Sequence, residues 1–173
     1  DELIEARRKA LNEGVGNTGE RLSTPELENH LKNRQLVDKN GKLYSNSKGI
    51  VGAHNSNEFY ANDVKVRNTN KIYDANGNEV KGIIEVEYSM PELDKTGKPT
   101  GNYNNKTFTK TIYDPNVISD TAYVNKGIEA ANSALANEPS GVLPRTWIGV
   151  DSEGVQWTGN SEGGVITSMW PTN

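Results

Sequence analysis

The chain contains two histidines, His30 and His54, in segments that suit proton transfer better than packing. His30 lies on a predicted helix, and His54 follows the small residues of the segment 49–53. The ordinary pKa of histidine is close to neutrality, so an imidazole can accept or donate a proton there. Two imidazoles suffice to cleave RNA without a metal, because one can remove the 2′-OH proton and the other can protonate the leaving 5′-oxygen. This chemistry requires that the two side chains meet in space.

The composition is that of one domain with a modest core. The 173 residues are 33% hydrophobic, and their mean hydropathy is −0.76. No apolar segment has the length needed to cross a membrane and no signal peptide is visible, so we expect no stable membrane insertion by this domain. Because the chain begins at Asp1 rather than at Met, we expect a fragment or a processed product. The absence of cysteine excludes disulfides and thiolate metal sites.

The charge is acidic overall but unevenly distributed. The net charge is −4 and the pI is about 5.3, whereas a nonspecific nucleic-acid binder of high affinity usually carries a basic surplus. No lysine follows Lys126, and beyond it only Arg145 is basic, so the positive charge lies in the N-terminal and middle parts. A local basic cleft is therefore compatible with the sequence, and the acidic surplus could attract a basic partner.

The N-terminal part predicts helices. Residues 1–22 are expected to form a short charged helix and a flexible linker, and residues 23–173 the main domain. Capping signals at 23–26 predict the start of a second helix. Leu27, His30 and Leu31 share one face of that helix, which places His30 at the edge of the core.

The remainder predicts strands and one longer helix. A hairpin is expected over 72–90, then a long turn-rich excursion over 91–105 and a strand over 106–112 that points Phe108, Lys110 and Ile112 to one face. A lysine in register with two apolar residues is expected near the core or a cleft. A helix is expected from Ser119 or Asp120 to about Asn137, with Val124, Ile128, Ala131 and Leu135 as its apolar stripe.

The C-terminal residues 145–170 predict antiparallel strands. In the last strand, alternation places Ile166, Ser168 and Trp170 on one face and Met169 on the other. Trp147 and Trp157 are expected in the core. Helices followed by a mostly antiparallel sheet indicate the α+β class.

Four motifs occur in an order that resembles the EndoU endoribonucleases. They are Asn29-His30-Leu31, Val51-Gly52-Ala53-His54, Phe108-Thr109-Lys110-Thr111 and Ser168-Met169-Trp170-Pro171-Thr172. That family has a helix-borne histidine, a second histidine after a glycine-rich step, a strand lysine and a Thr/Ser-x-Tyr-Pro motif near the C-terminus. Within it, the chain is most similar to the C-terminal toxin domains of contact-dependent growth inhibition (CdiA) proteins. The resemblance covers roughly residues 24–173 and implies the ribonuclease fold of the barnase, EndoU, colicin and RelE type.

The resemblance implies a role for each matched residue. His30 would be the general base, His54 the general acid, and Lys110 the cation that stabilises charge on the phosphate. Ser168 would contact the base or the phosphate, and Trp170 would stack on a nucleotide ring. Trp170 stands where the family has Tyr, so a contact that needs a phenol is absent and the preferred base is left open.

Asn55, which follows His54, is expected to contact a phosphate or a base. No metal and no cofactor are expected, because two histidines among scattered acids do not match a recognised ligand spacing. Without cysteine or a G-x-S-x-G motif, a cysteine or serine hydrolase is disfavoured.

The implied function is metal-independent cleavage of RNA to a 2′,3′-cyclic phosphate by a bacterial toxin. The toxin likeness suggests tRNA as the RNA, although no residue specifies which RNA is cut. It also implies surface presentation by the producing bacterium, action in the cytoplasm of a target cell, and a cognate immunity protein. Two alternatives stay open: a non-enzymatic binding module of a surface protein, which predicts that His30 and His54 lie far apart, and an EndoU-like domain that binds RNA without cutting it.

Overall fold

The computed structural model describes residues 24–173, and the predicted helix and linker over 1–22 lie outside them. The division into 1–22 and 23–173 therefore stays a prediction. The elements follow in the order α2 (Thr24–Lys32), β1 (Arg34–Gln35), η1 (Asn46–Lys48), β2 (Val51–Gly52), α3 (Ser56–Tyr60), β3 (Lys65–Tyr73), β4 (Glu79–Ser89), β5 (Pro91–Leu93), β6 (Pro99–Tyr103), β7 (Phe108–Tyr113), α4 (Asp120–Ala136), β8 (Thr146–Val150), β9 (Gln156–Glu162) and β10 (Val165–Pro171).

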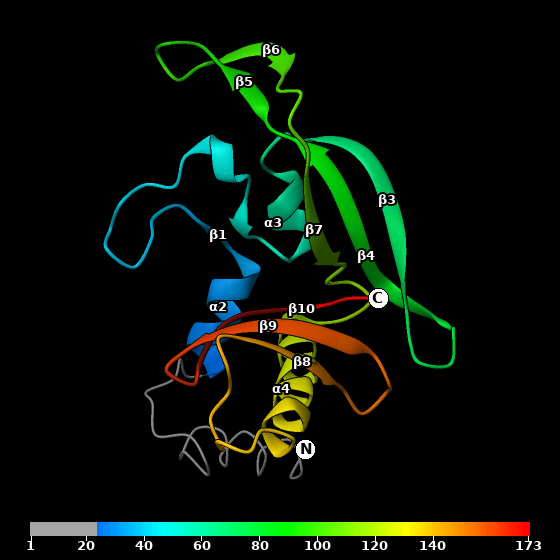
Figure 1. Ribbon diagram of the computed structural model, residues 1–173. Helices are drawn as coiled ribbons and strands as arrows, with labels where there is room; N and C mark the ends of the chain where they lie inside the picture. The colour runs from blue at the N-terminus through cyan, green and yellow to red at the C-terminus, as the bar shows by residue number, and fades with distance from the viewer. Residues whose placement is uncertain (1–23) are drawn as a thin grey trace.

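The described residues form two antiparallel three-stranded sheets, in the orders β3-β4-β7 and β10-β9-β8, and two smaller strand pairs. In Figure 1, α4 extends below the β10-β9-β8 sheet, and the β5–β6 hairpin projects at the opposite end of the molecule. The predicted α+β class with mostly antiparallel strands is confirmed for this part of the chain. Within it, no helix is long and apolar enough to cross a membrane.

The described residues form two hydrophobic clusters. The larger cluster joins α2 and α4 to the β10-β9-β8 sheet and includes Trp147 and Trp157, as predicted. The smaller cluster lies on the β3-β4-β7 sheet, where Phe59 of α3 packs edge-on against Tyr88 at a ring distance of 5.0 Å. The larger cluster also contains Ile72, Ile83 and Tyr113 of the β3-β4-β7 sheet, so both sheets contribute to it.

Most elements agree with their sequence patterns. The hairpin predicted over 72–90 is β3–β4, with its turn at Asn76-Gly77. The Ser119 side chain caps α4 by accepting a hydrogen bond from the Ala122 N–H at 3.0 Å. The predicted stripe of α4 is buried at Val124, Ile128 and Ala131, and Leu135 packs against it.

The segment 91–105 differs from the prediction, because it contains a second hairpin, β5–β6. Its turn is held by Asp94, whose Oδ1 accepts hydrogen bonds from the Thr96 and Lys98 backbone N–H groups at 2.8 and 3.0 Å. An aspartate that pairs with its own backbone two residues on is a turn signal. The strands were missed because they are short and exposed.

The faces predicted for β10 are wrong for Ile166. The register with β9 shifts between Ile166 and Ser168, so Thr167 is an extra residue in a β-bulge. A bulge interrupts the alternation of faces. As a result Ile166 and Met169 both enter the core, whereas Ser168 and Trp170 face away from it.

The two sheets approach each other at free edges. β7 is the outer strand of one sheet and β10 the outer strand of the other, and the Thr111 hydroxyl donates to the Pro171 carbonyl at 3.0 Å. The segment after β2 closes one end of this junction, since the Tyr113 N–H donates to the His54 carbonyl at 2.8 Å.

Candidate active site

A pocket of about 380 Å³ lies at the junction of β7 and β10. Four predicted site residues line it together: His54, Lys110, Ser168 and Trp170. The others are Ile50, Val51, Gly52, Glu85, Thr109, Thr111 and Asn160. The pocket thus collects side chains from the segment 50–54, from both sheets and from positions more than a hundred residues apart.

Backbone contacts hold His54 against the end of α2, the helix that carries His30. The His54 N–H donates to the Leu31 carbonyl and the Ala53 N–H to the Asn33 carbonyl, both at 2.9 Å. Gly52 permits this approach, because a Cβ there would lie 2.3 Å from the Asn33 oxygen. Ala53 adopts a φ of 54°, a left-handed conformation that is uncommon for a residue with a side chain. The chain is therefore forced into an unusual path directly before the histidine.

The His54 ring is buried and held in one orientation. Its Nδ1 hydrogen-bonds the Thr111 carbonyl at 2.7 Å, and the ring stacks on Tyr123 at a centroid distance of 6.3 Å. Burial, with the charges of Lys110 and His30, lowers the pKa of His54 to about 3, against the opposing effect of the Thr111 hydrogen bond. A neutral ring that donates from Nδ1 has Nε2 available to accept a proton.

His30 is not in the pocket lining, but the residue that follows it, Leu31, accepts a hydrogen bond from the His54 N–H at 2.9 Å. The charge of His30 also contributes to the lowered pKa of His54. Burial lowers the pKa of His30 as well, and a backbone hydrogen bond with Thr167 opposes that shift. The structure therefore brings the histidines together, contrary to the separation that the binding-module alternative predicts.

Lys110 supplies a cation that has no ion-pair partner among the described residues. Within residues 24–173 its ammonium forms no hydrogen bond and no ion pair. Burial lowers the pKa of Lys110 to about 8, so the group still carries its charge at neutral pH. An unpaired, partly desolvated ammonium is costly for folding and well suited to bind an anion.

Ser168 and Trp170 form the β10 side of the pocket. Asn160 of β9 lies opposite Ser168 in the strand register and lines the pocket with them. Within the described part of the chain, none of these three side chains forms a hydrogen bond. The wall combines an aromatic ring with polar groups that a ligand could use.

Asn55 lies outside the pocket lining, and its contact with a phosphate or a base stays a prediction. Its side-chain oxygen caps α3 by accepting from the Asn57 and Glu58 N–H groups at 2.9 and 3.4 Å. Its amide nitrogen donates to Asp120 at 2.9 Å. With both polar atoms engaged, Asn55 has a structural role.

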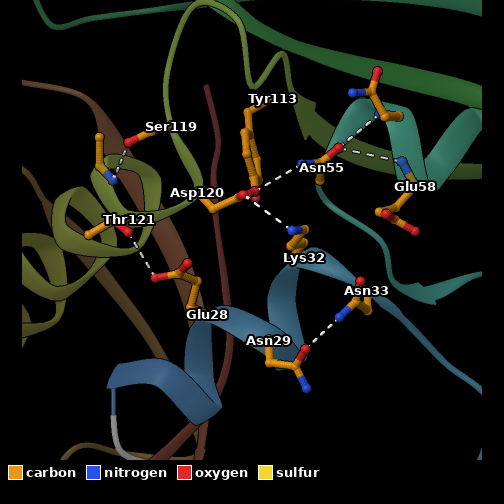
Figure 2. Close-up of polar contacts among 12 residues, drawn as sticks. Glu28, Asn29, Lys32, Asn33, Asn55, Glu58, Tyr113, Ser119, Asp120 and Thr121 are labelled. Carbon is orange, nitrogen blue, oxygen red and sulfur yellow. Dashed lines mark hydrogen bonds and ion pairs between the residues drawn. The ribbon is translucent and has the colours of Figure 1, made fainter.

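Asp120 is a residue that the sequence did not single out for the site. Figure 2 shows Lys32, Asn55 and Tyr113 converging on its carboxylate. Lys32 forms an ion pair with it at 3.6 Å, and the Tyr113 hydroxyl donates to it. Although burial acts in the opposite direction, the hydrogen bonds from Tyr113 and Asn55 and the charge of Lys32 hold the pKa of Asp120 below its usual value.

The Asp120 cluster (Lys32, Asn55, Tyr113 and Asp120) joins the segments that carry the candidate catalytic groups. Lys32 lies two residues after His30, Asn55 follows His54, and Tyr113 ends the strand of Lys110. These contacts link positions far apart in the chain, so no local sequence motif predicts them.

Glu85 and Asn160 also line the pocket, although the sequence did not predict them as site residues. Alternation along β4 places Glu85 opposite the buried face, but the sequence contains no sign that β10 would lie beside it. As for metals, residues 24–173 contain no group of three or more His, Asp or Glu side chains placed to hold an ion.

Half of the chain is similar to segments of two large bacterial proteins, and no protein-family model matches it. Over 97 residues, 54% of this chain and 3% of the relative, it is 42% identical to the tRNA nuclease CdiA of Escherichia coli (strain STEC_O31). Over 88 residues, 51% of this chain and 3% of the relative, it is 39% identical to the tRNA nuclease CdiA of Yersinia mollaretii. The matched segments thus make up about 3% of the length of each relative. The likeness to CdiA proteins indicated by the motifs is confirmed, and the assignment to EndoU stays a prediction.

Proposed function

We propose that this chain is the nuclease domain of a CdiA-type toxin and that it cleaves tRNA at the pocket between β7 and β10. The observation that carries the proposal is the convergence of His54, Lys110, Ser168 and Trp170 on one pocket, with the helix that carries His30 hydrogen-bonded to His54 through Leu31. The similarity to two proteins named tRNA nuclease CdiA supports both the nuclease activity and the choice of RNA.

The proposed reaction is metal-independent transesterification of the EndoU type. The 2′-oxygen forms a bond to phosphorus while the bond from phosphorus to the 5′-oxygen breaks, which gives a 2′,3′-cyclic phosphate and a 5′-hydroxyl. One histidine takes the 2′-OH proton, and the other delivers a proton to the 5′-oxygen. Lys110 neutralises the charge that develops on the nonbridging phosphate oxygens. RNA is required because the 2′-OH is the nucleophile.

The resemblance to EndoU enzymes assigns the base to His30 and the acid to His54. With a pKa of about 3, His54 is neutral in the free protein at pH 7. To act as the acid it must be protonated in the complex, where the phosphate anion raises the pKa of a nearby imidazole. The neutral ring with a free Nε2 supports the reverse assignment, in which His54 is the base.

The proposed toxin acts in the cytoplasm of a target cell after presentation at the surface of the producer. A cell that makes such an enzyme needs an immunity protein to protect its own RNA. We propose that this protein blocks the pocket. The likeness to segments of CdiA proteins supports these assignments.

The first test is incubation of the purified chain with total tRNA in EDTA, followed by mass spectrometry of the fragment ends. We expect cyclic-phosphate and 5′-hydroxyl ends, and a loss of about 10²- to 10⁴-fold in rate for His30→Ala and for His54→Ala, with circular dichroism unchanged. Ends with a 5′-phosphate, or full activity of either variant, would contradict the proposal. Retention of tRNA without new ends would favour the binding-only alternative.

A second substrate separates the acid from the base. A nucleoside 3′-(4-nitrophenyl phosphate) has a leaving group that needs no proton, so the variant that lacks the acid regains most of its rate on it. The variant that lacks the base stays slow. Recovery of His54→Ala alone supports the EndoU assignment, and recovery of His30→Ala alone supports the reverse.

A further inference from the structure

The pocket contains a carboxylate that the proposed reaction does not use. Glu85 lies in the middle of β4, opposite Thr111 in the register with β7, and lines the pocket. Its one hydrogen-bond partner within residues 24–173 is the Asn70 amide at 3.4 Å, near the outer limit for a hydrogen bond. No described lysine or arginine pairs with it. Most of the hydrogen-bonding capacity of Glu85 is therefore available to a ligand.

The other side of the pocket provides an aromatic ring. Trp170 lines it together with Ser168 and Asn160, and the polar atoms of all three are free of protein partners in the described part of the chain. A nucleobase has a flat face that stacks on an aromatic ring and an edge of donors and acceptors. The pocket can therefore contact a base both at its face, through Trp170, and at its edge, through Glu85.

We propose that Glu85 determines base specificity, and that the pocket selects a base with an exocyclic amino group on its Watson–Crick edge, guanine foremost, over uracil. This inference rests on the proposed function and concerns the nucleotide whose 2′-OH attacks.

The preference follows from the donors and acceptors of each base. A carboxylate only accepts hydrogen bonds, and guanine offers it adjacent donors at N1–H and the 2-amino group. Cytosine and adenine offer one amino group each. Uracil offers N3–H between two carbonyl oxygens, whose lone pairs would face the negative charge of Glu85. A site built around a hydrogen bond discriminates strongly against a ligand that cannot form it.

Four chimeric oligonucleotides test the preference directly. Each is DNA with a single ribonucleotide (G, C, A or U), so only one phosphate has a neighbouring 2′-OH. We expect kcat/KM to be about 10- to 100-fold higher for G than for U, with C and A between them. In Glu85→Gln the difference between G and U should fall to within about threefold, because the amide can donate to a uracil carbonyl.

Glu87→Gln is the matched control. Glu87 lies two residues along the same strand on the same face, pairs with Thr109 in the register and does not line the pocket. Its substitution should leave the order of bases unchanged. A wild-type preference for U, or an unchanged order in Glu85→Gln, would overturn the inference.

A binding measurement keeps this result separate from the cleavage proposal. Guanosine and uridine 3′-monophosphates are titrated against the wild-type chain and Glu85→Gln by isothermal calorimetry, which requires no chemistry. Tighter binding of the guanosine nucleotide to the wild-type chain alone supports the inference even if no RNA is cut, in which case the proposed function fails by itself. Equal binding of the two nucleotides to the wild-type chain overturns the inference.

Discussion

The Asp120 cluster and the pocket are built from neighbouring residues, yet they differ in how their polar groups are satisfied. In the cluster, the Asp120 carboxylate forms an ion pair with Lys32 and accepts hydrogen bonds from Asn55 and Tyr113. In the pocket, Lys110 has no such partner among the described residues. A satisfied network stabilises one arrangement of the chain, whereas an unsatisfied one costs stability until a ligand arrives. The Asp120 cluster therefore stabilises the position of the site, whereas the polar groups of the pocket are available to a ligand.

The two lysines give the largest expected contrast. We expect Lys110→Met to lower kcat about 10²- to 10³-fold on tRNA, because the charge on the phosphate loses its cation. Its free energy of unfolding should be equal to or above that of the wild-type chain, because a desolvated charge is removed. Lys32→Met removes a partly exposed ion pair, so it should cost up to about 1 kcal/mol and leave kcat within a few-fold.

Kinetics and urea unfolding of both variants measure this contrast. The charge of Lys110 also predicts the basic side of the pH profile. Since the pKa of Lys110 is about 8, kcat/KM should fall as the pH rises through that value. A Lys110→Met variant with normal kcat, or one that loses stability, would remove the distinction between the two lysines.

Substitution of Asp120 should have the next largest effect, which is a loss of stability. We expect Asp120→Ala to lower the free energy of unfolding by about 2–3 kcal/mol, because Tyr113 and Asn55 lose their acceptor. The pKa of Asp120 is lowered in the fold, so its ionised form stabilises the chain above the ordinary pKa of aspartate. That contribution is lost as the pH falls through the lowered pKa.

The difference between wild type and Asp120→Ala should therefore shrink between pH 6 and pH 2.5, as measured by urea unfolding at each pH. Asp120→Asn is the graded control, since it keeps an oxygen for Tyr113 and Asn55 and loses the ion pair with Lys32. Its cost should be about 1 kcal/mol. A pH-independent difference for Asp120→Ala would show that its charge is irrelevant to the cluster.

Two asparagines give the smallest contrast. Asn55→Ala removes the cap of α3 and one contact to Asp120, so it should lower the free energy of unfolding by about 1–2 kcal/mol. The Asn160 side chain forms no hydrogen bond within residues 24–173, so Asn160→Ala should change stability by less than about 0.5 kcal/mol. KM for tRNA should rise a few-fold in Asn160→Ala. Thermal unfolding and steady-state kinetics check both, and a reversed pattern would contradict the assignment of the two residues.

Local patterns predicted much of what positions the site. Alternation in β7 placed Lys110 with Phe108 and Ile112, and helical spacing placed His30 beside Leu27 and Leu31. These inferences succeed because side-chain direction repeats with the period of the element. They need no knowledge of other segments.

Contacts between distant segments could not be predicted in the same way. The approach of His54 to Leu31 depends on Gly52 and on the left-handed Ala53, neither of which specifies its partner. Glu85 enters the pocket only because β10 lies against the edge of β7. Asn55 carried a plausible signal, but a cap and a ligand contact use the same side chain. Only the fold distinguishes them.

The bulge at Thr167 has a consequence for how this strand can vary in sequence. Its extra residue keeps Ile166 and Met169 in the core while Ser168 and Trp170 line the pocket. The contact of Thr167 with His30 is made through the backbone, so most side chains there would preserve it. Deletion of this one residue would restore regular alternation and leave the two faces as they are, because Ile166, Ser168 and Met169 already pair with consecutive residues of β9. Position 167 should therefore tolerate many substitutions, whereas its deletion would keep the faces of the strand and remove the backbone contact with His30.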